Sequence, residues 1–172
     1  MAKPLANGYP IGAILMKDVI ASAMSAGAYR SECWYATKMM KSDTGAHGTT
    51  FGGSPLACAI GHHVLNRLSE PSFSVRMKET SGYLRERLEL LPRWFPEILQ
   101  DKIRGRGLIL GLGFKNTQDP GRVVGLARER GLFVLTAGNN VVRLVPSLTV
   151  GKEEIDMAVD VLEGSLAAML PA

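Results

Sequence analysis

Lys3-Pro-Leu-Ala-Asn-Gly-Tyr-Pro-Ile-Gly-Ala13 sets a single lysine beside turn-forming residues near the first residue of the chain. Pro4 disfavours helical dihedral angles at Lys3, and residues 7–10 have the composition of a turn. We therefore expect Lys3 at the junction of a strand and a loop. A lysine amine held there becomes a nucleophile when burial or a cationic neighbour favours its neutral form. The alternative is a solvated surface lysine near a chain end.

A second motif, Gly45-Ala-His-Gly-Thr-Thr-Phe-Gly-Gly-Ser-Pro-Leu-Ala57, is rich in glycine and hydroxyl residues. Pro55 suits the first turn of a helix, so we expect a loop that runs directly into one. Such a junction offers free backbone N–H groups and hydroxyls to an anion, most naturally a phosphate. The alternative is a glycine loop that only turns the chain.

The third motif, Asn139-Asn-Val-Val-Arg-Leu-Val-Pro-Ser-Leu-Thr149, is an apolar, strand-like run that contains one arginine, Arg143. Because an unpaired buried charge is costly, the guanidinium needs either water or an anionic partner. We interpret Arg143 as a carboxylate-binding residue, since its fork of N–H donors pairs with a carboxylate through two hydrogen bonds. Two alternatives remain: an edge-strand arginine that faces solvent, and a salt bridge to an Asp or Glu of the chain.

In this order and spacing, the three motifs resemble those of class III pyridoxal-phosphate aminotransferases, most closely the acetylornithine aminotransferases of fungi, over nearly the whole chain. The resemblance implies that Lys3 is the catalytic lysine, which binds the cofactor as a Schiff base and moves the proton of the substrate carbon. It implies that Thr50 binds the cofactor phosphate across a dimer interface. It also implies that Thr49 lies beside the substrate and that Arg143 holds the substrate α-carboxylate.

The implied reaction is the reversible transfer of an amino group between N-acetylornithine and 2-oxoglutarate, as in arginine biosynthesis, with pyridoxal 5'-phosphate as the electron sink. The complete enzyme is expected to be a homodimer. Ornithine aminotransferase and 4-aminobutyrate aminotransferase are the alternatives within the same class. A non-catalytic chain that binds an intact aminotransferase subunit is an alternative of a different class, and a mispredicted gene product with no role is another.

The chain departs from the family pattern in two ways. Relatives carry a large N-terminal part with a glycine-containing phosphate turn, an aromatic residue that stacks on the cofactor ring and an Asp that pairs with the ring nitrogen. None of these can be placed here, so we expect an incomplete chain that begins at an internal Met. Residues 25–44 are longer than the expected connection and show no helical or strand period, which favours an insertion such as translated intron sequence. A transcript that begins at Met1 and keeps these residues in frame would contradict this hypothesis.

Composition and charge limit the classes of function. With 46% hydrophobic residues, the 172-residue chain can bury a core. The net charge of +4 comes from arginines scattered among acidic residues, so nucleic-acid binding is not expected. Cys33 and Cys58 are too few for a disulfide scaffold, and no metal site is indicated.

The cellular compartment of the protein can be predicted only from the family resemblance. No apolar run reaches the roughly 20 residues of a membrane span, and no targeting peptide precedes Lys3. The fungal relatives work in the mitochondrial matrix, which is therefore the expected location of the enzyme. A chain made as written is expected to stay in the cytoplasm.

The pattern predicts an α/β protein, which the resemblance identifies as the C-terminal part of a fold type I pyridoxal-phosphate transferase. Residues 1–70 are expected to be a remnant of the large cofactor-binding domain, and residues 71–172 a bridging helix followed by the small C-terminal α/β domain. In the first part we expect a strand at 11–16 and helices at 17–24 and 55–68, the last with Leu56, Ile60, Val64 and Leu68 on one face. In the second part we expect a helix at 72–91 that ends at Pro92, strands at 103–114, 132–135 and 141–145, and helices at 121–130 and 152–169.

Overall fold

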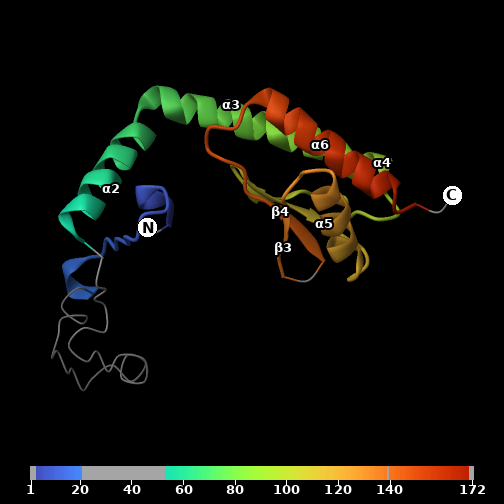
Figure 1. Cartoon of the computed structure of the whole chain (residues 1–172), viewed down its shortest axis with the longest axis horizontal. Helices are drawn as coiled ribbons and strands as arrows, with labels where there is room; N and C mark the ends of the chain where they lie inside the picture. The colour runs from blue at the N-terminus through green and yellow to red at the C-terminus, as the bar shows by residue number, and fades with distance from the viewer. Residues whose placement is uncertain (1–2, 21–52, 139, 171–172) are drawn as a thin grey trace, which may run out of the picture. The chain divides into compact units, whose positions relative to one another are not determined.

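The computed structural model describes residues 3–20, 53–138 and 140–170. The chain divides into two compact units, Met1–Glu70 (unit 1) and Pro71–Ala172 (unit 2) (Figure 1). Unit 1 contains the 3-10 helix η1 (Lys3–Ala6) and helix α2 (Pro55–Leu68). Unit 2 contains helices α3 (Pro71–Leu88), α4 (Leu91–Trp94), α5 (Asp119–Glu129) and α6 (Lys152–Ala167), with strands β1 (Arg104–Arg106), β2 (Ile109–Gly113), β3 (Leu135–Thr136) and β4 (Val141–Leu144). The predicted α/β class is confirmed, and no described helix is long and apolar enough to cross a membrane.

Helix α2 begins and ends where the sequence predicts, at Pro55 and Leu68. Ser54 is its N-cap: the Ser54 hydroxyl accepts a hydrogen bond from the Ala57 N–H at 3.3 Å. This bond satisfies one of the backbone donors that every helix leaves free in its first turn. Pro55 has no N–H, so it loses no hydrogen bond at the first helical position. The sequence around Ser54 therefore fixes the start of α2.

The turn η1, the blue coil beside the N mark in Figure 1, contacts α2. Small residues meet in this contact. Leu5 and Ala6 are buried, and so are Ala57 and Gly61, which lie one turn apart on α2. A β-carbon on Gly61 would lie only 3.8 Å from the Leu5 carbonyl oxygen. The predicted apolar face of α2 is not the buried one, since Leu56 is 57% exposed. Small side chains let two backbones approach closely, so η1 contacts the alanine and glycine face instead.

Two predictions for residues 3–20 are wrong. Lys3 opens the 3-10 helix η1 instead of standing at the end of a strand. Pro4 is compatible with this turn because the start of a helix needs no intrahelical N–H bond, and the Pro4 carbonyl accepts from the Asn7 N–H at 3.3 Å. Residues 11–16, predicted as a strand, have no strand conformation in the structure. Of the predicted helix 17–24, residues 18–20 are helical and the rest lies outside the described residues.

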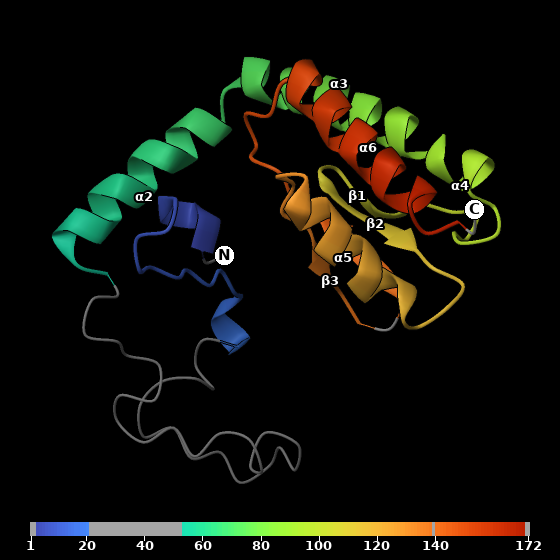
Figure 2. The same cartoon turned by 45° about the vertical axis from the view of Figure 1, so that its right-hand side comes forward.

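Unit 2 is built on a four-stranded antiparallel sheet with the strand order β1-β2-β4-β3. Figure 2 labels β1, β2 and β3 of this sheet. In the central pair, Leu110 lies opposite Leu144, and Gly111 lies opposite Arg143. Because side chains alternate along a strand, these two pairs face opposite sides of the sheet. Leu110 and Leu144 are buried and Arg143 is exposed, so one side of the sheet faces the core.

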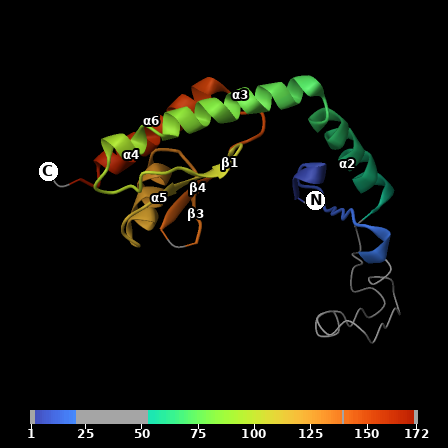
Figure 3. The ribbon, with the colours of Figure 1, turned by 180° about the vertical axis from the view of Figure 1, so that it is seen from behind.

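The helices of unit 2 pack on the Leu110 side of the sheet. Helices α3 and α6 lie side by side, and α5 contacts α6, β3 and β4 (Figures 1 and 3). Buried residues of all these helices join the sheet in one hydrophobic cluster, which includes Leu84, Leu88, Leu110, Leu112, Val123, Ala127, Val142 and Leu144. From α6 the cluster contains Ile155, Val159, Leu162 and Leu166, so the helical spacing read in the sequence is confirmed as the buried face.

Two predicted elements of unit 2 are divided in the structure. The predicted strand 103–114 is a hairpin in which β1 pairs with β2. Gly105 and Gly107 have φ values of 105° and 60°, which favour glycine, and they bend the chain back on itself. The predicted helix 72–91 ends at Leu88, and Pro92 lies inside α4 instead of ending the first helix. Proline is tolerated there because the first turn of a helix needs no N–H partner.

Polar contacts join α3 to α6 beside the core. The Tyr83 hydroxyl donates to Asp156 Oδ1 at 2.7 Å, and Arg87 Nε lies 2.8 Å from the same oxygen. Arg87 also reaches Asp160, with 3.4 Å between Nη2 and Oδ1. The hydrogen bond to Asp156 raises the pKa of Tyr83 above its ordinary value of 10.0, because the carboxylate favours the protonated phenol.

We expect Leu88→Ala to destabilise unit 2 by about 2–5 kcal/mol, because Leu88 is fully buried and its removal leaves a cavity. Val75→Ala on the same helix is the matched control. Val75 is 57% exposed, and its truncation should change the free energy of unfolding by less than about 0.5 kcal/mol. Urea unfolding followed by circular dichroism measures both changes, and equal effects would contradict the assigned core.

The contact between Tyr83 and Asp156 predicts a pH-dependent contribution to stability. A pKa that is raised in the folded state gives a stabilisation that is complete below the unfolded value and is lost as the pH rises through the folded value. Tyr83→Phe should therefore lower the free energy of unfolding at about pH 8, and this deficit should shrink by about pH 11. Urea unfolding of both proteins across this range measures the deficit. A deficit that stays constant would show that the Tyr83 phenol does not titrate against Asp156.

Candidate functional site

Lys3 lies in unit 1, as the first residue of η1. Its backbone belongs to the described part of the chain and its side chain does not. Leu5 and Ala6, which follow it in η1, are buried. The turn η1 contacts α2 (Figure 2). The lysine of the first motif and the helix of the second motif are therefore brought together in one compact unit.

The start of α2 has donors that suit a phosphate. Gly53 has a φ of 73° and turns the backbone ahead of Ser54. The Ser54 hydroxyl is occupied by the Ala57 N–H, whereas the Leu56 N–H in the same first turn has no partner among the described residues. Free N–H groups and the positive end of the helix dipole attract an anion. Thr49 and Thr50, the predicted substrate and phosphate residues, lie outside the described residues.

Arg143 lies in unit 2, in β4, which is one of the two inner strands of the sheet. Its side chain is exposed on the side of the sheet that is opposite the core. Within the described ranges it takes part in no ion pair. Since β4 is an inner strand, the edge position in the first alternative is wrong, whereas the exposure of the side chain to solvent agrees with it. The second alternative, a salt bridge, finds no partner among the described Asp and Glu residues.

Two residues that the sequence analysis did not single out as site residues lie on the same side of the sheet. Arg104 Nη2 donates to Gln100 Oε1 at 2.6 Å, and Gln100 Nε2 donates to the Phe114 carbonyl at 2.8 Å. A sequence signal for them exists in the alternating glycines of β2, Gly111 and Gly113. Glycines two residues apart leave one face of a strand without side chains, so neighbouring side chains can lie over it.

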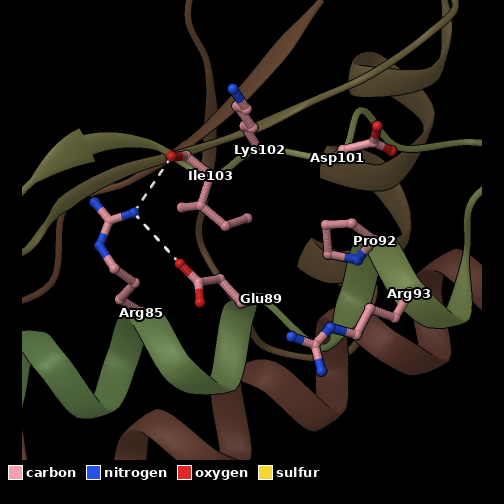
Figure 4. Close-up of a pocket in the computed structure, with 7 residues that line it drawn as sticks. All are labelled: Arg85, Glu89, Pro92, Arg93, Asp101, Lys102 and Ile103. Atoms are coloured by element: carbon pink, nitrogen blue, oxygen red, sulfur yellow. Dashed lines mark hydrogen bonds and ion pairs between the residues drawn. The ribbon is translucent and has the colours of Figure 1, made fainter.

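A surface hollow of about 520 Å³ lies elsewhere in unit 2, between α3, α4 and the segment that leads into β1 (Figure 4). Arg85 donates to the carbonyls of Ile103 at 3.3 Å and Gly105 at 2.8 Å, and so ties α3 to β1. Glu89 lies 3.7 Å from Arg85 on the same helix. The lining is mostly charged and contains no predicted site residue, which is unlike the apolar lining of most small-molecule pockets.

Residues 1–166 match the family model described as Aminotransferase class-III. The chain belongs to this family. Members of the class-III aminotransferase family use pyridoxal phosphate, and the Leu56 N–H at the start of α2 is a donor of the kind that a phosphate accepts from.

Curated relatives of this class-III aminotransferase chain include mitochondrial acetylornithine aminotransferases of two fungi. The protein of Yarrowia lipolytica is 36% identical over 96% of this chain and 35% of its own length. The protein of Neurospora crassa is 38% identical over 98% of this chain and 32% of its own length. The chain thus spans about a third of the length of these relatives.

Solved structures show the same fold. N-acetylornithine aminotransferase from Stenotrophomonas maltophilia is 31% identical, with a TM-score of 0.62 over 69% of this chain and 32% of that protein. Lysine aminotransferase from M. tuberculosis is 29% identical, also with a TM-score of 0.62, over 67% of this chain and 26% of that protein. The predicted α/β fold of a pyridoxal-phosphate transferase is thereby confirmed.

We expect Gly61→Leu to detach η1 from α2, because the larger side chain would meet the Leu5 backbone. Gly61→Ala is the matched control, since it adds only a β-carbon at ordinary contact distances of 3.7–3.9 Å. Hydrogen exchange at the Tyr9 amide, which bonds the Ala6 carbonyl at 3.1 Å, reports on the turn that follows Lys3. Faster exchange in Gly61→Leu alone would support the contact, and equal exchange in the two variants would contradict it.

Proposed function

We propose that this chain carries the lysine-bearing and carboxylate-binding parts of a pyridoxal 5'-phosphate-dependent acetylornithine aminotransferase. The reaction is the reversible transfer of an amino group between N-acetylornithine and 2-oxoglutarate, a step of arginine biosynthesis. One observation carries the proposal: two relatives named acetylornithine aminotransferase are 36% and 38% identical to the chain over nearly its whole length.

In this proposal Lys3 is the catalytic residue. Its amine binds the cofactor and moves the proton of the substrate carbon that bears the amino group. Pyridoxal phosphate supplies the electron sink for that carbon when it is bound. The contact of η1 with α2 supports this role, because it holds the Lys3 backbone in the same unit as a helix start that fits a phosphate.

Thr50 is the proposed phosphate ligand, together with the N–H groups at the start of α2, and Thr49 is proposed to lie beside the substrate. Both threonines come just before Gly53 in the sequence. We further propose that the complete enzyme is a homodimer in which each site uses Thr50 of the neighbouring subunit.

Arg143 is the proposed ligand of the substrate α-carboxylate. Its exposure on an inner strand, without an ion-pair partner among the described residues, supports this role. A guanidinium that is fixed at its base by a paired strand and free at its tip can form two parallel hydrogen bonds with a carboxylate.

The proposal extends to the organisation of the enzyme. Residues 1–70 are a remnant of a large cofactor-binding domain, and residues 71–172 are a bridging helix followed by the small C-terminal α/β domain, so further polypeptide completes the cofactor site. This is supported by the chain's span of about a third of its relatives. The mitochondrial matrix is the proposed location, because both fungal relatives are named mitochondrial.

Borohydride reduction of the 172-residue chain in the presence of pyridoxal phosphate, followed by peptide mass mapping, tests the role of Lys3. We expect saturable labelling that is confined to Lys3 and lost in Lys3→Arg. Lys17→Arg is the matched control, because Lys17 is an exposed lysine of the same unit. Labelling that is absent, or spread over many lysines, or unchanged in Lys3→Arg, would show that Lys3 is not the cofactor-binding residue.

A further inference from the structure

Asn7 and Gly8 form a turn directly after η1, and the proposed reaction uses neither residue. Their φ values are 50° and 101°, so both lie in the left-handed region, which asparagine and glycine adopt most readily. The Asn7 N–H donates to the Pro4 carbonyl at 3.3 Å, and the Tyr9 N–H donates to the Ala6 carbonyl at 3.1 Å. These two bonds hold the backbone on both sides of Gly8 and leave its own N–H unused.

The two groups that could react with each other in this turn have no partner among the residues that the structure describes. The Asn7 side chain is exposed and forms no hydrogen bond, and the Gly8 N–H donates to no carbonyl. A β-carbon on Gly8 would meet nothing within 4 Å, so the space around it is open. A backbone nitrogen that follows an asparagine can attack the side-chain amide most easily when its own residue has no side chain in the way.

The other asparagines in the described part of the chain are held or covered. Asn66 Nδ2 lies 3.4 Å from Nδ1 of His62, and Asn116 Oδ1 accepts a backbone N–H two residues ahead at 3.3 Å. Asn140 Oδ1 is buried. The residue after each of these three carries a β-carbon and a longer side chain, which crowd the following N–H. Among them, Asn7 alone combines an exposed, unbonded carboxamide with a following glycine.

We propose that Asn7 is a site of spontaneous deamidation. The Gly8 nitrogen loses its proton to a base in solution and attacks Asn7 Cγ. A C–N bond forms, the bond from Cγ to Nδ2 breaks, and Nδ2 leaves as ammonia with a proton taken from water. Water then opens the resulting five-membered imide, at Cγ to give aspartate or at the main-chain carbonyl carbon of Asn7 to give isoaspartate. Water is the only co-reactant, and nothing is oxidised or reduced.

Both products alter the turn. Aspartate places a negative charge where the neutral amide was. Isoaspartate also routes the main chain through the β-carbon, and this extra atom falls inside the turn that the Tyr9 N–H closes on Ala6. Lys3 lies at the other end of η1, so we expect isoaspartate to loosen the segment that holds its backbone. The chemistry at Asn7 does not depend on the proposed function, whereas its effect on cofactor labelling rests on it.

The test follows the mass of the peptide that contains Asn7 while the 172-residue chain stands in mildly alkaline buffer. We expect Asn7 to convert at least about tenfold faster than Asn66 and Asn116 in the same sample. Its rate should lie within about threefold of that in a synthetic peptide of residues 3–13, because the fold protects neither reacting group. The rate should rise with pH, since the Gly8 nitrogen must lose its proton. Asn7→Gly is the control, because glycine accepts the same φ and has no amide to lose.

The effect on the turn is measured on isoaspartate-containing chain, separated by chromatography and identified by fragment-ion mass spectrometry. Hydrogen exchange at the Tyr9 amide should be at least about threefold faster in this form than in the unconverted chain. Pyridoxyl labelling of Lys3 should fall by about the same factor. Freshly purified Asn7→Asp is the matched control, because it carries the new charge without the extra main-chain atom.

Three outcomes would overturn the inference. In the first, Asn7 converts more than about tenfold more slowly in the folded chain than in the peptide, so the fold protects it. In the second, Asn66 or Asn116 converts as fast as Asn7. In the third, isoaspartate leaves the exchange of the Tyr9 amide unchanged, and the proposed effect on the turn then fails. Absence of Lys3 labelling in the unconverted chain would contradict the proposed function instead, while the mass and exchange measurements still decide the inference.

Discussion

The pairing of β2 with β4 is the constraint on which the rest of unit 2 depends. The register that sets Leu110 against Leu144 under the helices also sets Arg143 against Gly111 on the other side. A slip of one residue would turn Arg143 into the core and Leu144 out of it. Because an unpaired buried charge is costly, such a slip is disfavoured twice, by the exposed leucine and by the buried guanidinium. The hydrogen bonds that build the core therefore also place Arg143, the proposed carboxylate ligand, on the exposed side of the sheet.

Structural features are predicted best where they are determined only by residues that are close in the sequence. Helix α6 repeats apolar residues at helical spacing, and Glu154 reaches back to the Gly151 N–H at 2.8 Å, so both its face and its start can be read from the chain. The start of α2 is equally readable, because Ser54 and Pro55 are each suited to one position only. Arg143 could be singled out because it is the one charge in an apolar strand.

The structural predictions that were wrong concern features set by contacts between segments that are distant in the sequence. The pattern at 103–114 is that of a single strand, and the hairpin follows only from the left-handed conformations of Gly105 and Gly107. The buried face of α2 is set by the approach of η1, which favours the small residue Gly61 over the larger apolar ones. The alternating glycines of β2 mark a face without side chains, but the sequence alone does not show that Gln100 lies over Gly113. Packing partners, and not propensities, decide these features.

The backbone around Arg143 is packed more extensively than the backbone around Lys3. This difference matches the proposed roles of the two residues. Arg143 stands on an inner strand that is hydrogen-bonded on both edges and backed by the largest cluster of buried side chains in the described chain. Among the described elements, the turn that begins at Lys3 contacts α2, where Ala57 and Gly61 are buried. Local opening requires less free energy where fewer apolar contacts and paired backbone groups are lost, so we expect η1 to open more readily than β4. A residue that recognises a carboxylate gains from a fixed position. A lysine that must release the cofactor and then carry a proton can do so more readily when its backbone segment is able to move.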